Sequence, residues 1–133
     1  MSVNQDIYVE LRTRYNTGWS PVPTEFPNES FVRPTSGIWA RFTIVANKET
    51  QMDIGDDLKT FRVSGFIVVQ LFVSPNQGTI DILTKADIVA DMFRNWSGPS
   101  VVCRESTVKT IGNDDDGWHQ MNIVTPFKCD IQK

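Results

Sequence analysis

Few residues of this chain are of types that carry out chemistry. Its one histidine, His119, follows Trp118, and no serine or cysteine motif lies beside it. A catalytic triad converges in space and not in sequence, so the residues alone do not exclude one, but an isolated histidine is usually structural or exposed. The chain contains no phosphate-binding glycine loop, no G-x-S-x-G and no H-E-x-x-H motif. We assign no catalytic residue and no cofactor, and we predict that the chain is not an enzyme.

The densest group of carboxylates is Asp114–Asp116, which Gly117 follows. A hard cation binds several oxygen ligands, and three adjacent aspartates could supply some of them. The group lacks the alternating ligand spacing and the distal glutamate of an EF-hand loop. We therefore interpret it as a solvated acidic turn and predict no metal site, although Asp114, Asp115 and Asp116 are the candidates for one.

The two cysteines, Cys103 and Cys129, are too few and too far apart for a structural zinc site. They could lie on adjacent strands of a C-terminal hairpin, where a disulfide remains an alternative. In a reducing compartment we expect two small buried thiols.

Two arginines, Arg41 and Arg62, interrupt stretches that are otherwise apolar or neutral. They could pair with the acidic segments Gly55–Asp57 and Asp114–Asp116, within one subunit or across a subunit boundary. Internal or exposed pairing is the simpler interpretation, and an exposed pair contributes only about 0–1 kcal/mol.

The central stretch of the chain, Lys59–Trp96, predicts one long strand followed by one helix. Phe61–Val73 is rich in β-branched and aromatic residues, and both of its faces are apolar from Phe66 onward, as in a central strand covered on both sides. After a Pro-Asn-Gln-Gly turn, apolar residues recur every three or four positions and predict a helix over Thr79–Asn95.

The remaining patterns predict an α+β domain. They indicate a first helix over 3–16, a short extended edge in the proline-rich segment 19–27, and strands over 38–45, 101–111 and 118–127. Residues 47–60 form either a long β-arm or a loop. We expect a two-layer sandwich with a mostly antiparallel sheet of about four to five strands and both helices packed on one face.

Length and composition are those of one globular domain covering residues 1–133. The chain is 40% hydrophobic and 22% charged, with a net charge of -3 that gives no general attraction to nucleic acid or anionic lipid. No apolar run reaches the roughly 20 residues that span a bilayer, and the N-terminus lacks the regions of a secretory signal. We expect a protein that is soluble and stays in a cytoplasm, with no membrane partner and no sequence-specific nucleic acid.

The ordered set of motifs resembles the phage tail terminator-like proteins, which are small virion proteins also found in prophages. The matching pieces are a first helix ending near Tyr15-Asn16, the Trp-plus-proline segment, Ile38–Ile44, Arg62–Phe72, Pro75–Gly78 and Gly117–Phe127.

This resemblance implies a non-enzymatic structural role. Such proteins assemble as a ring, commonly a hexamer, that caps the growing tail, ends tube polymerisation and forms the head-joining surface. The implied partners are other copies of the chain, the tail-tube protein and the head–tail joining proteins. The implied location is the virion tail, and the host cytoplasm during assembly.

Position and charge suggest which residues would contact another subunit or the tube. They are Arg41, Lys48, Asp53, Asp56, Asp57, Lys59, Arg62, Asp114, Asp115 and Asp116. Two alternatives remain open: another phage tail-tube or head-completion protein, and a small α+β ligand-binding module or enzyme with walls of tryptophan.

Overall fold

A computed structural model describes residues 3–17, 22–52 and 59–132. The elements in these ranges are two helices and six strands. They are α1 (Val3–Thr17), β1 (Thr24–Glu25), β2 (Ile38–Gln51), β3 (Thr60–Val73), α2 (Ile80–Phe93), β4 (Val101–Cys103), β5 (Thr107–Asn113) and β6 (His119–Gln132).

The strands form one open sheet in the order β1-β2-β3-β6-β4, and β5 also pairs with β6. Only the pairing of β1 with β2 is parallel. The three long strands lie in simple antiparallel register, with Ile38 opposite Val73 and Val73 opposite His119. The α+β class and the mostly antiparallel sheet are confirmed.

The predicted strand over 101–111 is wrong, because it is two strands. The carbonyl of Pro126 accepts a hydrogen bond from the Arg104 N–H at 3.0 Å, so Pro126 presents its backbone to this edge of β6. Proline has no N–H to donate there, and the ladder is interrupted between Cys103 and Thr107. Among the described residues the sheet therefore has six strands where four to five were expected, and the predicted two-layer form is not confirmed.

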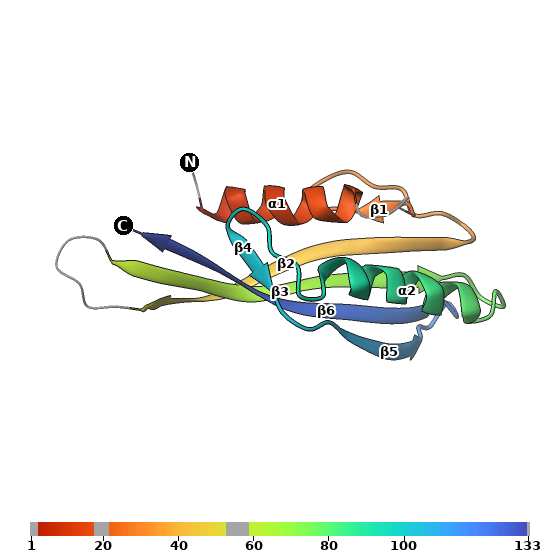
Figure 1. Cartoon of the computed structure of the whole chain (residues 1–133). Helices are drawn as coiled ribbons and strands as arrows, with labels where there is room; N and C mark the ends of the chain where they lie inside the picture. Colours follow the sequence, from red (N-terminus) through yellow and green to blue (C-terminus); the bar gives the residue numbers. More distant parts are fainter. Residues whose placement is uncertain (1–2, 18–21, 53–58, 133) are drawn as a thin grey trace.

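One face of the sheet carries the core. Alternate residues of β3 are almost completely buried, among them Ile67, Val69 and Leu71. Both helices lie over this face (Figure 1). The stripe of α2 that contains Ile82 and Val89 joins the same core cluster, as the helical spacing predicted.

The other face of β3 is not covered by a helix, so the prediction of cover on both sides is wrong. Phe66 is 37% exposed, and its neighbour on β2, Val45, is 45% exposed. Both helices of the described chain lie on the other side, so the outer side chains are covered by one another and by the segment before β2, in which the Phe31 ring lies 5.6 Å from that of Trp39. The clearest case is Trp39, whose ring stacks on Phe72 with centroids 4.2 Å apart.

The described part of residues 47–60 is a β-arm, since β2 runs on to Gln51 and β3 begins at Thr60. A register shift between Ala46 and Lys48 bends the arm. Gly65 lies opposite this shift, and a Cβ there would stand 2.1 Å from the Val45 carbonyl oxygen. Residues 53–58 lie outside the described residues.

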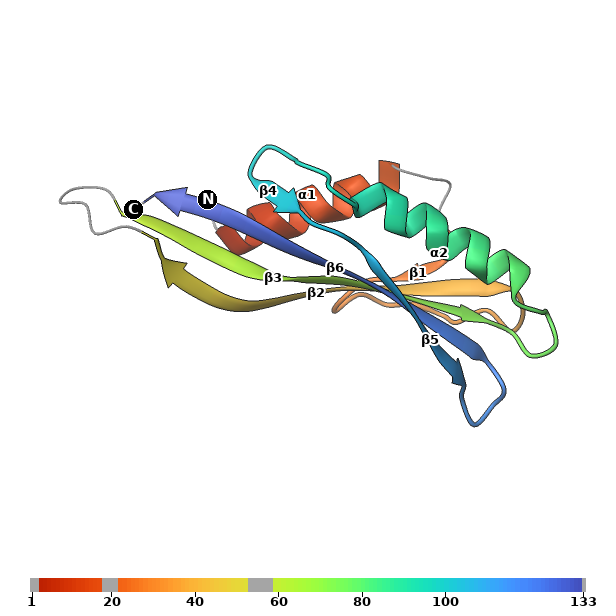
Figure 2. The ribbon, with the colours of Figure 1, turned by 60° about the horizontal axis from the view of Figure 1, so that its bottom comes forward.

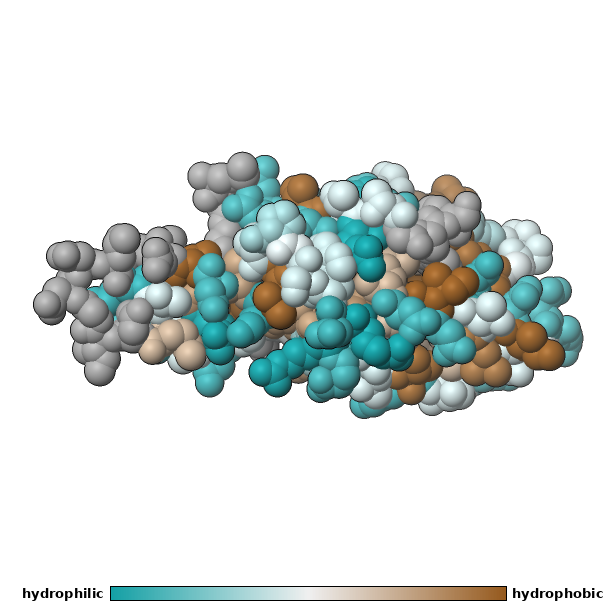
Figure 3. All heavy atoms as spheres, in the orientation of Figure 1, coloured by the Kyte–Doolittle hydropathy of each residue, from teal (hydrophilic) through white to brown (hydrophobic). Residues whose placement is uncertain are grey.

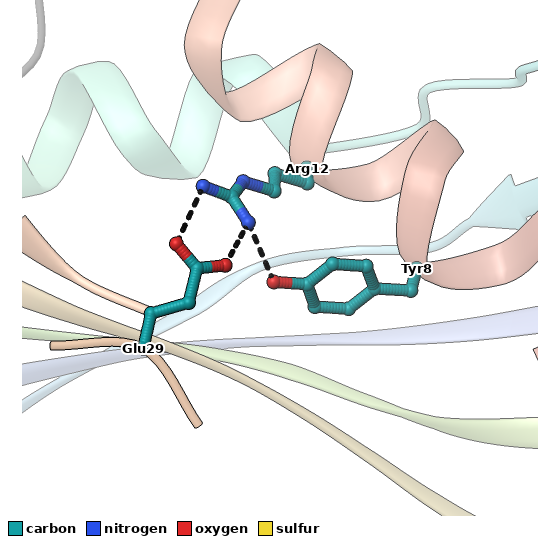
Figure 4. Close-up of polar contacts among 3 residues, drawn as sticks. All are labelled: Tyr8, Arg12 and Glu29. Carbon is teal, nitrogen blue, oxygen red and sulfur yellow. Dashed lines mark hydrogen bonds and ion pairs between the residues drawn. The ribbon is translucent and has the colours of Figure 1, made fainter. Parts of the chain in front are cut away.

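Polar contacts hold α1 and the segment after β1 together. Arg12 forms an ion pair with Glu29 and donates to the Tyr8 hydroxyl at 3.0 Å (Figure 4). Its guanidinium also lies 3.7 Å from the centre of the Phe26 ring. Tyr15, also on α1, is buried in the core, and burial raises its pKa to about 12.

Candidate functional site

The face of the sheet that no helix covers is the candidate interaction surface, and we call it the open face. It consists of the outward-pointing residues of β2, β3 and β6. The register places Lys48, Ser64 and Lys128 side by side near the arm, and Arg41, Gln70 and Asn122 side by side near the other end.

A basic hollow of about 330 Å³ lies at the arm end of the open face. Four cationic side chains line it, those of Lys48, Arg62, Arg104 and Lys128, and Phe66 contributes an apolar wall. No carboxylate is among its lining residues. An arrangement of this kind favours an anionic partner.

Within the described part of the chain, Asp130 is the carboxylate that interacts with these cations, by an ion pair with Arg62 and by the nearby charge of Lys128. Arg62 donates two hydrogen bonds to Asp130, from Nε at 2.8 Å and from Nη2 at 3.1 Å. This contact lowers the pKa of Asp130 and raises that of Arg62. The pair is exposed to solvent, so its contribution to stability is small.

An aromatic hollow of about 380 Å³ lies at the other end of the sheet. The guanidinium of Arg33 lies 4.9 Å from the Trp39 ring, and that of Arg41 lies 5.6 Å from the same ring. These cations and the stacked Trp39–Phe72 pair make a rigid wall. The lining residues are Arg33, Pro34, Trp39, Arg41, Phe72, Asp114, Asp116, Trp118 and Gln120.

The residues Asp114–Asp116 form a turn between β5 and β6, which we call the acidic turn. The Oδ1 atom of Asp114 accepts hydrogen bonds from the backbone N–H groups of Asp116 and Trp118, both at 2.9 Å. Asp114 therefore holds the turn, while Asp115 and Asp116 are exposed. Within residues 3–17, 22–52 and 59–132, no three potential ligands are grouped to hold a metal ion.

The structure divides the predicted interface residues between the two ends. It brings Arg41, Asp114 and Asp116 together at the aromatic hollow, and Lys48 and Arg62 together at the basic hollow. Asp115 is exposed on the acidic turn, and Lys59 directly precedes β3. Asp53, Asp56 and Asp57 lie outside the described residues.

Among the described residues, the two arginines pair with other carboxylates than the acidic turn, and the Gly55–Asp57 segment lies outside the described residues. The Nε atom of Arg41 donates to Glu25 at 2.6 Å, and Arg62 pairs with Asp130. Neither contact within the described chain uses the acidic turn or the Gly55–Asp57 segment. A contact of these arginines with another subunit remains a prediction.

Sequence reasoning missed Arg33, Arg104 and Lys128. Lys128 follows the predicted end of its strand at Phe127, whereas β6 continues to Gln132. The alternation of β6 would have placed Lys128 on the same face as Gln120 and Asn122. Arg104 was missed because the sequence predicted one unbroken strand over 101–111. In the structure it lies after the end of β4, where its N–H donates to the Pro126 carbonyl.

The cysteines and the histidine have structural positions. Cys103 and Cys129 lie on the adjacent strands β4 and β6, and both are buried free thiols, as expected. Burial raises the pKa of Cys103 to about 12. The Nδ1 atom of His119 lies 2.9 Å from the side-chain oxygen of Asn113, across the β5–β6 pair.

Residues 6–127 match the family model described as phage tail terminator protein. The chain belongs to this family. It is therefore a structural protein of the phage tail, a component of the virion tail that interacts with other tail or head proteins. The family is one of structural proteins, which agrees with the prediction of a non-enzyme.

Solved structures with the same fold exist, and one of them has low sequence identity to this chain. It shares 17% identity with this terminator and superposes with a TM-score of 0.63, covering 96% of each chain. No curated protein sequence matches the chain. Among the described residues, neither helix is long and apolar enough to cross a membrane.

Proposed function

We propose that this terminator closes into a ring, a hexamer, on the end of the growing tail tube. The ring ends tube polymerisation and forms the surface to which the head is joined. It acts as one non-enzymatic domain, present in the host cytoplasm during assembly and in the virion tail afterwards. Its partners are copies of itself, the tail-tube protein and the head–tail joining proteins.

The observation that carries this proposal is the open face with unlike ends. A basic hollow lies at one end and an acidic turn lies at the other. A heterologous contact joins two different surfaces of neighbouring subunits, and its rotation decides whether a ring closes. Unlike ends suit that kind of contact, whereas a two-fold dimer needs a patch that complements itself.

The predicted interface residues fit this arrangement. Lys48, Lys59 and Arg62 lie on or beside the arm, and Arg41 with the acidic turn lies at the far end. Asp53, Asp56 and Asp57 belong to the segment that joins β2 to β3, and we propose the same role for them. Charge complementarity would set register and partner choice more than affinity.

Deleting the gene from its phage or prophage tests this function. Without a terminator, we expect tubes of uncontrolled length that lack heads, visible by electron microscopy. Supplying the wild-type chain from a plasmid should restore tails of uniform length joined to heads. Tails of normal length in the deletion strain would contradict the proposal.

The main rival within phage structure is a tail-tube protein, which forms open stacks. Electron microscopy of the purified chain separates the two functions, because a terminator should give single closed rings. Stacks that lengthen with protein concentration would favour the tube protein.

A further inference from the structure

We propose that the basic hollow of one subunit binds the acidic turn of the next copy of this chain. The inference rests on the proposed ring and names the two surfaces that meet in it. It is carried by the charge of the hollow, by the distance between the two surfaces and by the fixed shape of the turn.

The basic hollow has an excess of positive charge among the described residues, which favours an anionic partner. Lys48, Arg104 and Lys128 make no ion pair with any carboxylate among the described residues, and Arg62 already holds Asp130. Like charges that are gathered around one hollow repel one another unless a partner neutralises them. A partner that presents several negative charges on a small projection would complement this hollow.

The acidic turn of the same subunit cannot be that partner. The hollow lies at Ser64 on β3, whereas the turn lies beyond Phe72, eight residues further along the strand. At about 3.3 Å per residue this separation is roughly 26 Å. The arm and the β5–β6 turn lie at opposite ends of the sheet (Figure 2).

The acidic turn has the chemistry that the hollow needs. It is the densest group of carboxylates in the sequence. Two backbone hydrogen bonds to Asp114 fix its shape, so binding would order few new torsions. Arg33 and Arg41 line the hollow beside it, but Arg41 already pairs with Glu25, and the turn retains an excess of negative charge.

Polar residues lie at both ends of the open face, with Lys48, Ser64 and Lys128 at one end and Arg41, Gln70 and Asn122 at the other. Figure 3 shows the molecule from the side, where hydrophilic and hydrophobic residues are interspersed. On the open face, Phe66 and Val45 are the partly exposed apolar residues near the basic hollow. A subunit of this kind stays soluble alone and gains specificity from charge on assembly.

Charge reversal at both surfaces tests the inference. A hollow variant carries Lys48→Glu, Arg104→Glu and Lys128→Glu, so that its net charge is reversed while Arg62 keeps Asp130. A turn variant carries Asp115→Lys and Asp116→Lys, leaving Asp114 to hold the turn. Lys85→Glu and Asp87→Lys on α2 are matched controls of each sign. Circular dichroism confirms that each variant is folded, and light scattering over a range of concentrations measures its mass.

We expect each variant alone to need a concentration about tenfold or more above that of the wild type for half-assembly. A 1:1 mixture of the two should assemble, because the reversed hollow then meets the reversed turn and the native hollow meets the native turn. The α2 controls should assemble like the wild type. Raising the ionic strength to about 1 M should weaken the wild-type assembly.

Several results would overturn the inference. The first is that both variants assemble as the wild type does. The second is that the 1:1 mixture of the two variants stays monomeric. The third is that the wild-type chain is monomeric at all concentrations. A hollow variant that assembles normally but loses binding to a short DNA duplex would assign the hollow to a nucleic acid instead. Tail length in the complemented deletion strain decides the proposed function separately, so the two can fail independently.

Discussion

The two faces of the central sheet are built from the same three strands but differ in how far their side chains are buried. On the covered face, Phe42, Leu71 and Ile123 are at most 1% exposed. On the open face, Phe66 and Val45 are more than a third exposed, although they are equally apolar. Apolar character therefore does not decide burial by itself. The helices bury one face. On the other face Trp39 and Phe72 are buried by stacking on each other and by Phe31, whereas Phe66 and Val45 remain available for contact with other molecules.

The largest expected effect is a difference in the free energy of unfolding between mutations on the two faces. Phe42→Ala removes a fully buried ring and should lower the free energy of unfolding by about 3–5 kcal/mol, because it leaves a cavity. The matched change on the open face, Phe66→Ala, should cost about 1 kcal/mol or less. Urea denaturation measures both changes. Equal losses would break the distinction between the two faces.

A smaller effect should come from the bend in the arm. Gly65→Ala would place a methyl group against the Val45 carbonyl, and the backbone of β2 would have to move. We expect a loss of about 1–3 kcal/mol in urea denaturation, as for other overpacked sites. Ser64→Ala, one residue away and facing outward, should change stability by less than about 0.5 kcal/mol. If Gly65→Ala matched that control, the close approach of β2 and β3 would be incorrect.

The smallest effect should be a pH dependence of stability that comes from the Arg12–Glu29 ion pair, which joins α1 to the segment after β1. The ion pair with Arg12 lowers the pKa of Glu29, so its contribution is present above the ordinary carboxyl pKa of about 4.3 and is lost as the pH falls through the folded value. Glu29→Gln should lower the melting temperature slightly at neutral pH, and the difference should shrink below about pH 4.

The exposed Glu105 provides the control for that measurement, because no ion pair joins it to a described residue. Glu105→Gln should leave the pH profile of the melting temperature unchanged. A Glu29→Gln difference that persisted at low pH would contradict the sign of the Glu29 shift.

Much of the fold could be predicted from local patterns. Alternation over Phe61–Val73 and helical spacing over Thr79–Asn95 reflect which side chains meet the core, so both elements lie within a residue or two of their predicted bounds. The break between β4 and β5 could not be predicted in this way. It depends on which edge of β6 the Pro126 backbone faces, and only the pairing of strands determines that.

The candidate surface was only half predicted, for a related reason. Arg62 stands out as a charge within an apolar strand, but its neighbours Arg104 and Lys128 lie 42 and 66 residues further along the sequence, after β4 and on β6. Charges on separate strands form one surface only when the register is known. The covering of one face and the exposure of the other likewise depend on where both helices pack.

Electron cryomicroscopy of the purified terminator, at a concentration where it assembles, tests the central claim most directly. We predict closed rings in which the open face is buried between neighbours and the basic hollow of each subunit meets the acidic turn of the next. Open stacks, or rings whose subunits leave the open face exposed to solvent, would contradict it.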